Sequence, residues 1–225
     1  MTISALISDL DGTLIDTRER SIQAHASAFQ RVGYQIEIDT IRALYHYSFD
    51  ANELFRHLNI RLSKSNFTRY LQGFKTAFYK NWRYSKVFPG VRKTLEYLRE
   101  HVEYMRLITS RQGVESTRRE VRHFGLDKVF DGVFTRGDLA QVEGKDQIPL
   151  FPYLPQRRRL LRFALQGVTL DGSVWVVGDT PGELEAAKSL GFTTIGVLTG
   201  FGVEETLKPV ADYLLPSVAE IVQLI

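Results

Sequence analysis

The stretch ISALISDLDGTLIDT, residues 3–17, is the part of the sequence that best indicates the fold. Its first six residues form a short apolar run, and this length suits a buried β-strand. The run ends at Asp9, and Gly12 marks a loop directly after it. A lone pair of aspartates such as Asp9 and Asp11 is usually part of a turn, but here the pair directly follows a predicted strand. We therefore expect both side chains at the end of that strand.

Predicted strands alternate with predicted helices over the second half of the chain. Apolar residues recur at helical spacing after Gly90, between Val114 and Phe124, and in two later segments, 156–166 and 182–190. The predicted strands lie over residues 104–109, 129–134, 174–177, 193–197 and 213–215. Such alternation is typical of a parallel sheet with helices on both faces. We predict an α/β fold with a Rossmann-like, three-layer parallel-sheet core.

Residues 17–85 interrupt this alternation, because they contain no convincing strand. Asp16 and Glu19 resemble a capping box, which predicts that a helix begins there. A longer helix is predicted over residues 63–82, and we interpret its aromatic stripe as a packing face rather than a ligand site. The simplest organisation is an α-helical domain of residues 17–85 inserted into a core domain of residues 1–16 and 86–225.

The composition restricts the class of protein. The 225 residues are 44% hydrophobic and 24% charged, which is ordinary for a globular protein. Cysteine is absent, so disulfides and thiolate metal sites are excluded. The formal charge is only +3, and we interpret the three arginines at 157–159 as a solvated helix face, so we expect no nucleic-acid partner. No apolar run reaches the ~20 residues that span a bilayer, and the N-terminus does not resemble a signal peptide. We expect a cytoplasmic protein with no membrane partner.

Polar residues follow three of the predicted strands, at the edge where parallel sheets bind ligands. They are Asp9, Asp11, Thr109, Ser110 and Asp179, and Lys145 lies in a loop that could reach the same edge. Crowded carboxylates repel one another unless a cation neutralises them, and oxygen ligands without histidine or cysteine favour Mg²⁺. A lysine and a threonine hydroxyl nearby would complete a phosphate site. Because GxxxxGK[ST] and GxGxxG motifs are both absent, the pattern favours Mg²⁺-dependent phosphoryl chemistry outside the P-loop and dinucleotide folds.

Four segments, in the expected order, resemble the four motifs of the haloacid dehalogenase (HAD) superfamily. They are DLDGTLIDT at 9–17, LITS at 107–110, Lys145 within GKD, and VVGDTPGE at 176–183. The first is long and specific, whereas the third is weak taken alone and has Lys128 as a competitor. The insertion between the first two motifs is similar to the helical cap of the phosphoglycolate phosphatase-like group. The resemblance implies a HAD-like core with an inserted cap domain.

The resemblance also implies a role for each motif residue. Asp9 is the expected nucleophile that forms an aspartyl-phosphate, and Asp11 is the expected general acid and base. Phosphoryl oxygens would be held by Thr109 and Ser110, while Lys145 would neutralise the nucleophile and the developing charge. The expected Mg²⁺ ligands are Asp9, the Asp11 carbonyl and Asp179.

Glu183 departs from the family pattern, which usually has an aspartate at this position. Glutamate keeps the charge on a side chain that is one methylene longer, so Glu183 would bind the metal through water or orient Lys145. The alternative is an exposed acidic residue in the first turn of a helix, where the helix dipole favours it. We include Glu183 among the predicted metal ligands and expect Glu185 on the surface.

Asp11 and the helical insertion narrow the expected activity. The resemblance implies that an acidic residue at position 11 favours phosphate-ester chemistry over dehalogenation. A cap favours small substrates, because it closes over them and excludes water. We expect a phosphatase acting on a small phosphorylated metabolite, as a monomer or homodimer. A sugar phosphomutase of the same superfamily and a catalytically inactive HAD-like binding module are the alternatives.

Several other residues have two open interpretations. Arg111 follows the predicted phosphate-binding strand, and it would either reach an anionic substrate or form a surface salt bridge. Four residues of the insertion were considered as substrate contacts, although such residues are more often packing or surface residues: Arg42, Tyr45, His46 and Tyr47.

Overall fold

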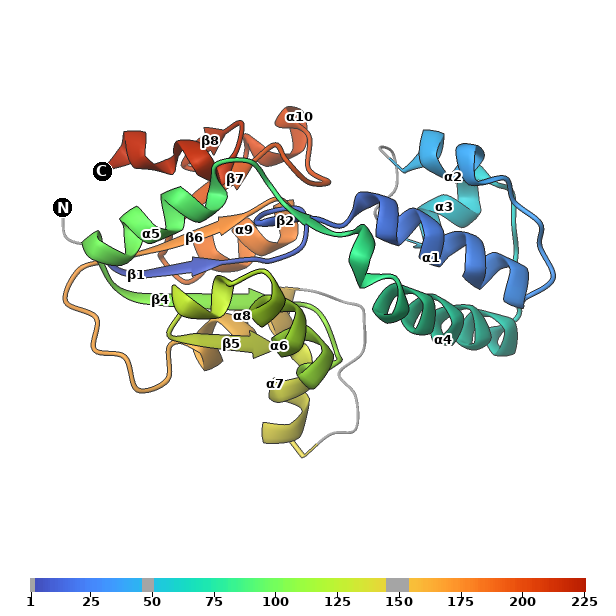
Figure 1. Cartoon of the computed structure of the whole chain (residues 1–225), viewed down its shortest axis with the longest axis horizontal. Helices are drawn as coiled ribbons and strands as arrows, with labels where there is room; N and C mark the ends of the chain where they lie inside the picture. Colours follow the sequence, from blue (N-terminus) through green and yellow to red (C-terminus); the bar gives the residue numbers. More distant parts are fainter. Residues whose placement is uncertain (1–2, 46–50, 145–153) are drawn as a thin grey trace. The chain divides into compact units, whose positions relative to one another are not determined.

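A computed structural model of the chain describes residues 3–45, 51–144 and 154–225 (Figure 1). The chain divides into two compact units. The first, which we call the core unit, contains Met1–Asp16 and Val87–Ile225. The second, the helical unit, contains Thr17–Lys86. Each unit is described separately below.

The core unit is built on one six-stranded sheet with the order β5-β4-β1-β6-β7-β8. Every neighbouring pair of strands in this sheet is parallel. Its strands are β1 (Ile3–Ser8), β4 (Val102–Thr109), β5 (Gly132–Thr135), β6 (Ser173–Gly178), β7 (Thr193–Val197) and β8 (Tyr213–Leu215). The predicted parallel sheet is therefore confirmed.

Helices cover both faces of the sheet, and alternate residues of each strand face different helices. In β6, Trp175 and Val177 pack into one hydrophobic cluster, whereas Val174 and Val176 pack into the other. The first cluster includes side chains of α5 (Val91–His101), α6 (Val114–His123), η2 (Leu126–Lys128) and η3 (Val218–Leu224). The second includes side chains of α7 (Arg136–Val142), α8 (Leu154–Ala164) and α9 (Pro181–Lys188). This confirms the predicted three-layer α/β core, to which the short helix α10 (Glu204–Leu207) also belongs.

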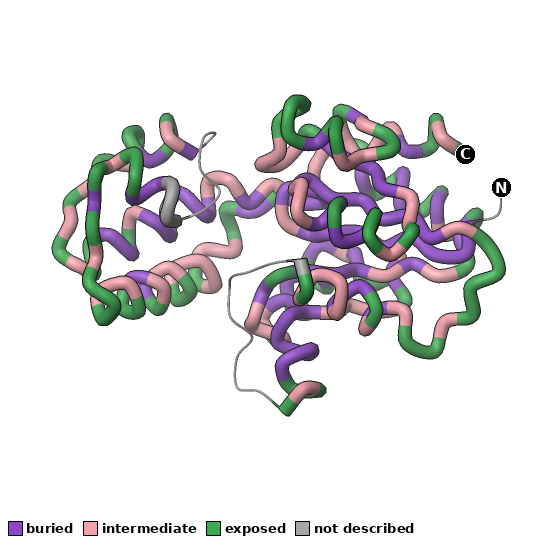
Figure 2. Tube along the Cα trace, turned by 180° about the vertical axis from the view of Figure 1, so that it is seen from behind, coloured by how far each residue is buried: buried purple, intermediate pink, exposed green. Residues whose placement is uncertain are grey.

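β1 lies in the middle of the sheet and aligns the ends of its neighbours. All six of its residues are buried, as the tube in Figure 2 also shows for this part of the chain. Ser8 is in register with Leu107 of β4 and Val177 of β6, and the Asp9 amide continues the pairing to the Val177 carbonyl at 3.0 Å. The residues that follow β1, β4 and β6 therefore emerge at one edge of the sheet.

The helical unit has an aromatic core of its own. Its elements are α1 (Arg18–Arg31), α2 (Ile38–Leu44), α3 (Ala51–His57), α4 (Lys64–Lys80) and η1 (Trp82–Tyr84). Phe29, Phe55 and Tyr70 meet with ring centroids 4.8–5.6 Å apart. Gly73 lets α1 and α4 approach closely, because a Cβ there would lie 2.9 Å from Arg31 Cδ. Phe74 and Phe78 pack against His25 and Arg20, which agrees with the predicted packing role of the aromatic stripe.

Two short strands were not predicted, and three local expectations differ from the structure. β2 (Ile15–Asp16) and β3 (Lys86–Val87) form a two-stranded sheet. The capping box predicted at Asp16 does not form, because α1 has Thr17 at its N-cap, and Glu19 instead accepts hydrogen bonds from Gln23 and Arg42. Residues 129–131 lie outside β5, and the C-terminal helix is a 3₁₀ helix.

The residues considered as substrate contacts in the insertion have mixed outcomes. Arg42 is exposed and forms ion pairs with Glu19 and Asp39, both in the helical unit. Tyr45 is buried. His46 and Tyr47 lie outside the described residues. The surface interpretation fits Arg42 and the packing interpretation fits Tyr45.

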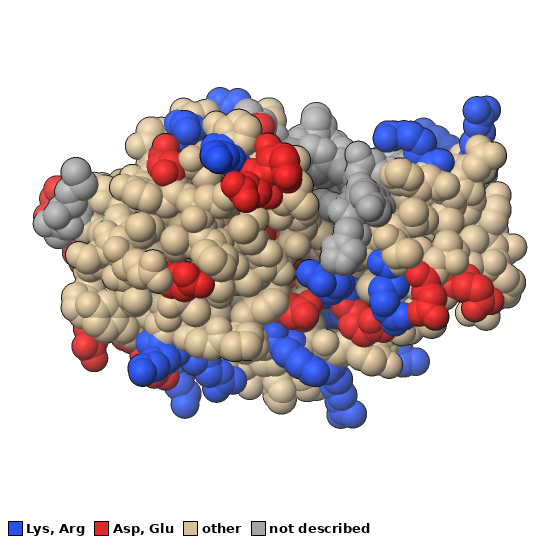
Figure 3. Space-filling view, turned by 90° about the horizontal axis from the view of Figure 1, so that it is seen from above, with Lys and Arg blue, Asp and Glu red and all other residues tan. Residues whose placement is uncertain are grey.

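Surface charge and hydropathy add little to the functional assignment. The face shown in Figure 3 carries acidic and basic side chains in mixed groups. Within the described part of the chain, no helix is both long enough and apolar enough to cross a membrane. The cytoplasmic location and the monomeric or homodimeric state stay predictions.

Candidate active site

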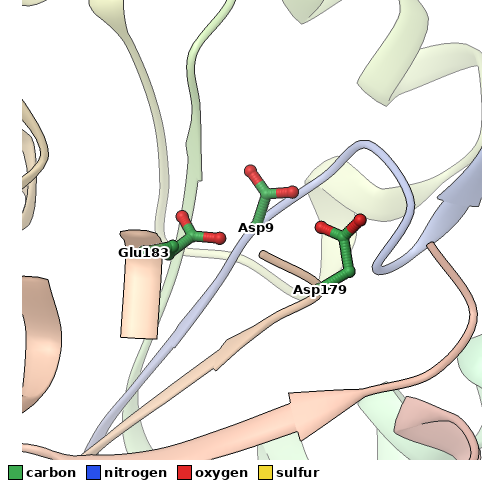
Figure 4. Close-up of side chains that lie close together, drawn as sticks. All are labelled: Asp9, Asp179 and Glu183. Atoms are coloured by element: carbon green, nitrogen blue, oxygen red, sulfur yellow. The ribbon is translucent and has the colours of Figure 1, made fainter. Parts of the chain in front are cut away.

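Three buried carboxylates converge at the edge where the central strands end. They belong to Asp9, Asp179 and Glu183, and one oxygen of each lies within 4.8 Å of the others. Figure 4 shows the three carboxylate groups turned toward a common space. We call these three residues the carboxylate cluster. The structure thus brings together three residues that the sequence predicted as metal ligands.

The positions of Asp9 and Asp179 follow from the strands that precede them. Asp9 directly follows β1, and Asp179 directly follows β6. The Phe201 amide donates to Asp179 Oδ2 at 2.8 Å, and this close approach requires a glycine at 200, where a Cβ would lie 2.4 Å from Asp179 Cγ. Thr13 Oγ1 lies 3.4 Å from Asp9 Oδ2 and 3.3 Å from Asp179 Oδ1. The threonine hydroxyl therefore bridges the two aspartates.

Glu183 reaches the cluster from the first turn of α9. The helix begins at Pro181, whose fixed φ suits the first helical position. The Glu183 side chain lies over Gly178, where a Cβ would be 2.4 Å from Oε2. It is buried, which excludes the alternative of an exposed acidic residue, while Glu185 is exposed as predicted. Glu183 Oε2 is buried and has no hydrogen-bond partner within residues 3–45, 51–144 and 154–225.

Burial disfavours ionisation of all three carboxyl groups, and repulsion by neighbouring carboxylates adds to this effect at Asp9 and Glu183. Desolvation raises the pKa of Asp9 well above its usual value, and the charges of Glu183, Asp179 and Asp11 raise it further. Desolvation raises the pKa of Asp179 to about 6, against the lowering effect of the Phe201 hydrogen bond. Desolvation also raises the pKa of Glu183 to about 7, although Arg157 acts in the opposite direction. In the folded protein, the protonated forms of these three carboxyl groups are therefore favoured more than they would be in water.

Arg157 of α8 partly compensates this charge. Its Nη1 lies 3.8 Å from Glu183 Oε2 and donates to Thr180 Oγ1 at 3.0 Å. The side chain is only 16% exposed, so for Arg157 the expectation of a solvated arginine face was wrong. Within the described part of the chain, the positive charge of Arg157 lowers the pKa of each of the three carboxyl groups.

The residues present fit a divalent cation. The donor atoms are all carboxylate oxygens, which suit hard cations such as Mg²⁺. One of them, Glu183 Oε2, is buried without a hydrogen-bond partner among the described residues, and burial disfavours three negative charges here unless a cation joins them. The cluster is therefore a candidate metal site, and the identity of the ion as Mg²⁺ stays a prediction.

Asp11 is held in a different arrangement, beside the cluster. Arg111 donates to both of its carboxylate oxygens, from Nε at 2.8 Å and from Nη2 at 2.7 Å. The same guanidinium donates to both oxygens of Glu120, at 2.7 and 3.2 Å. Arg111 is buried, so it is neither the surface salt bridge nor the free substrate contact that the sequence suggested. We call Asp11, Arg111 and Glu120 the arginine-centred triad.

The remaining predicted site residues lie near this edge or outside the described chain. Thr109 is buried at the end of β4, with its hydroxyl 3.5 Å from Asp11 Oδ2. Ser110, the next residue, is exposed. Lys145 lies outside the described residues, and its competitor Lys128 is exposed in η2. The roles of Asp11 through its carbonyl, and of Thr109, Ser110 and Lys145, stay predictions.

Sequence reasoning missed three residues of this edge. Thr13 lies inside the DLDGT motif, and a hydroxyl four residues after Asp9 was a signal that could have found it. Glu120 lies nine residues after Arg111, and its pairing depends on α6 packing beside the end of β4. Arg157 was hidden within a run of three arginines, because its orientation depends on how α8 packs against the sheet.

Comparisons with known proteins agree with this architecture. The sequence matches the family model of haloacid dehalogenase-like hydrolases over residues 6–197. A 5'-nucleotidase from Pseudomonas aeruginosa is 28% identical over 221 residues, which cover 90% of this chain and 86% of that protein. A protein from Caldanaerobacter subterraneus named "Putative pyrophosphatase PpaX" is 25% identical over 230 residues, covering 100% and 96%. A solved structure from Haemophilus somnus, described as a predicted phosphoglycolate phosphatase, superposes with a TM-score of 0.72 at 19% identity, covering 100% and 98% of the two chains.

The structure has an α/β fold with a parallel sheet and acidic motif residues at the carboxyl edge of that sheet. The family match covers most of the chain, and the chain belongs to the haloacid dehalogenase-like hydrolases. The predicted family and the predicted enzyme class are confirmed.

Proposed function

We propose that this chain is a Mg²⁺-dependent phosphatase that hydrolyses a small phosphorylated metabolite through an aspartyl-phosphate on Asp9. The observation that carries the proposal is the buried carboxylate cluster, with its unpartnered Glu183 oxygen, at the carboxyl ends of β1 and β6. Membership of a hydrolase family and the names of the relatives support phosphate-ester hydrolysis as the reaction.

In the first step, a carboxylate oxygen of Asp9 attacks phosphorus. The bond between phosphorus and the ester oxygen breaks, and its electron pair stays on that oxygen. Protonated Asp11 donates its proton to the leaving oxygen, which departs as an alcohol. The products of this step are the aspartyl-phosphate of Asp9, the alcohol and the Asp11 carboxylate.

In the second step, water hydrolyses the aspartyl-phosphate. The Asp11 carboxylate takes one proton from the water, and the remaining hydroxide oxygen bonds to phosphorus. The bond between phosphorus and the Asp9 oxygen breaks, which releases inorganic phosphate and restores the Asp9 carboxylate. Asp11 is again protonated, so the cycle closes without any other reactant.

Cationic groups must reduce the repulsion between Asp9 and the phosphoryl oxygens. Asp9, Asp179 and Glu183 would hold the Mg²⁺ ion, which when bound supplies positive charge beside the nucleophile. Thr109, Ser110 and Lys145 would hold the transferred phosphoryl group. Arg157, whose guanidinium already lies 3.8 Å from Glu183, is a further source of positive charge at this edge.

We propose that the helical unit serves as a cap that limits the substrate to small molecules. Its support is its position in the sequence, between the segments that carry Asp9 and Thr109, and its separate aromatic core. The relatives named 5'-nucleotidase and pyrophosphatase make nucleoside monophosphates and pyrophosphate the first substrates to test.

The test is phosphate release from a panel of small phosphorylated compounds, with Mg²⁺ and with EDTA. The panel contains nucleoside monophosphates, pyrophosphate, phosphoglycolate, hexose phosphates and phenyl phosphates. We expect metal-dependent release that Asp9→Asn abolishes. Asp16→Asn is the matched control, because it removes an aspartate of the same segment outside the carboxylate cluster.

Three results would contradict the proposal. Release that persists in Asp9→Asn would show that Asp9 is not the nucleophile. Isomerised sugar phosphate with little free phosphate would instead indicate a phosphomutase, and a folded protein that is silent on the whole panel would favour a binding module.

A further inference from the structure

The arginine-centred triad connects a buried helix residue to the edge of the sheet. The side chains of Glu120 and Arg111 are 3% and 4% exposed, whereas that of Asp11 is 22% exposed. One guanidinium therefore links a buried glutamate to an aspartate whose carboxylate is partly exposed to solvent. All three residues belong to the core unit.

The hydrogen bonds of the triad fix the orientation of the Asp11 carboxylate. Arg111 contacts both Asp11 oxygens through two different nitrogens, and this planar, two-point contact prevents the carboxylate from rotating. Glu120 accepts hydrogen bonds from the same guanidinium through both of its own oxygens, so the orientation of the Arg111 side chain is fixed as well. The Arg111 amide also donates to Thr109 Oγ1 at 3.3 Å, which ties its backbone to the end of β4.

Stability alone is a weak explanation for this arrangement. Removing two carboxylates and a guanidinium from water is costly, and apolar residues of similar volume often stabilise a protein equally well. Asp11 Oδ2 accepts from Arg111 Nε and from the Thr109 hydroxyl, whereas Oδ1 accepts from Arg111 Nη2. A carboxylate oxygen has two lone pairs, so the guanidinium leaves one acceptor position on Oδ1. The triad thus restricts the position of Asp11 while leaving it able to exchange a proton.

We propose that Arg111 and Glu120 are positioning residues that hold Asp11 in place for proton transfer to and from the reacting groups. This inference rests on the proposed function. Its consequence is specific, because a misplaced Asp11 impairs the transfer of the proton to the leaving oxygen. Substrates whose leaving oxygen is weakly basic need that proton much less than substrates whose leaving oxygen is strongly basic.

The experiment compares phenyl phosphate with p-nitrophenyl phosphate in the wild type, Arg111→Lys and Glu120→Gln. The two substrates have nearly the same size, but the nitro group makes the leaving oxygen far less basic. We expect Arg111→Lys to lower kcat/KM for phenyl phosphate by about 10- to 100-fold, which is within the range of general acid catalysis. For p-nitrophenyl phosphate we expect a loss below about threefold, because that leaving group departs without a proton.

Glu120→Gln tests whether the hydrogen bonds between Arg111 and Glu120 contribute to the positioning of Asp11. It keeps the size of the side chain and removes its charge, so we expect the same selective loss at a smaller magnitude. Arg118→Lys is the control, because Arg118 makes an ion pair from the same helix to Asp138 rather than to Asp11. We expect this control to leave the ratio of the two kcat/KM values unchanged.

The ratio of the two substrates separates positioning from folding. A partly unfolded variant loses activity on both substrates equally, so an equal loss, or no loss, in Arg111→Lys and Glu120→Gln would overturn the inference. A second readout is the phosphoenzyme that forms from p-nitrophenyl phosphate and is trapped by acid quench. We expect it to accumulate in Arg111→Lys because Asp11 also activates water, and an unchanged level would count against the positioning role. If the wild type releases no phosphate from any substrate, the proposed function fails instead.

Discussion

The carboxylate cluster and the arginine-centred triad lie at the same edge of the sheet but differ in how their charge is balanced. In the triad, one guanidinium donates to all four oxygens of Asp11 and Glu120. In the cluster, three carboxylates have one guanidinium 3.8 Å from Glu183, and Glu183 Oε2 has no hydrogen-bond partner among the described residues. In the triad, the described chain itself supplies the cation that fixes a carboxylate. In the cluster, three buried carboxylates lie together, which suits the cation that we propose to bind there.

Asp9→Asn is expected to have the largest effect, with opposite signs for activity and stability. Loss of the nucleophile should lower phosphate release by at least about 10³-fold. The metal-free protein should become more stable at pH 8, because the substitution removes one of three repelling buried charges. Phosphate release and urea unfolding in EDTA measure the two effects. A fall in stability would mean that the three carboxylates do not repel one another in the folded protein.

Loss of a guanidinium should cost more stability in the triad than beside the cluster. Arg111→Met leaves the buried Glu120 and the partly exposed Asp11 without their main partner, and loss of a buried partner typically costs about 3–5 kcal/mol. Arg157→Met removes one hydrogen bond and a longer ion contact from a side chain that is 16% exposed, so the loss should be smaller. Urea unfolding of both variants tests this order. If the two variants lose the same free energy of unfolding, the triad does not depend on its guanidinium more than the carboxylate cluster depends on Arg157.

Added Mg²⁺ should stabilise the core unit at pH 8 and much less at pH 5. Because folding raises the pKa of Glu183 to about 7, the metal-free protein binds protons on folding. Its stability is therefore greatest below the ordinary carboxyl pKa and declines as pH rises toward about 7. A bound cation offsets that decline, by about 2.7 kcal/mol at 100 times its Kd. Unfolding with Mg²⁺ or EDTA across this pH range is the measurement, with Glu183→Gln as the variant expected to lose most of the gain.

Glu183→Asp should produce the smallest effect. It keeps the negative charge but shortens the side chain by one methylene, which moves the carboxylate back toward α9. We expect the Mg²⁺ concentration for half-maximal activity to rise by less than about tenfold. A Mg²⁺ titration of phosphate release measures it. A loss as large as that of Glu183→Gln would show that the length of this side chain is as important as its charge.

Much of the fold could be predicted because local patterns and tertiary structure agree in the core unit. Short apolar runs such as ISALIS and VWVV became buried central strands, and each ended at an acidic residue as expected. The capping box at Asp16 failed because the chain first forms β2, so α1 begins only at Arg18. A two-residue strand carries too little sequence signal to be predicted.

The candidate site was predictable where it lies within motifs, and not where it depends on packing between distant elements. Asp9 and Asp179 follow short apolar runs, and such runs are a clear signal for buried strands. Arg111 was noticed, but its burial and its pairing with Glu120 depend on the placement of α6, which no local pattern specifies. Arg157 was interpreted as exposed because periodicity on a helix does not show which face meets the sheet.

The central position of β1 has a consequence for synthesis of the chain. Ile3 pairs with Val102 and Ser173, so β1 lacks one of its two neighbouring strands until residue 173 has been made. At 5–20 residues per second, that delay is roughly 10–30 s. The helical unit, whose residues are contiguous, can fold during this interval. Asp9 joins Asp179 and Glu183 only after residue 183 has emerged, so the carboxylate cluster cannot form before most of the chain has been made.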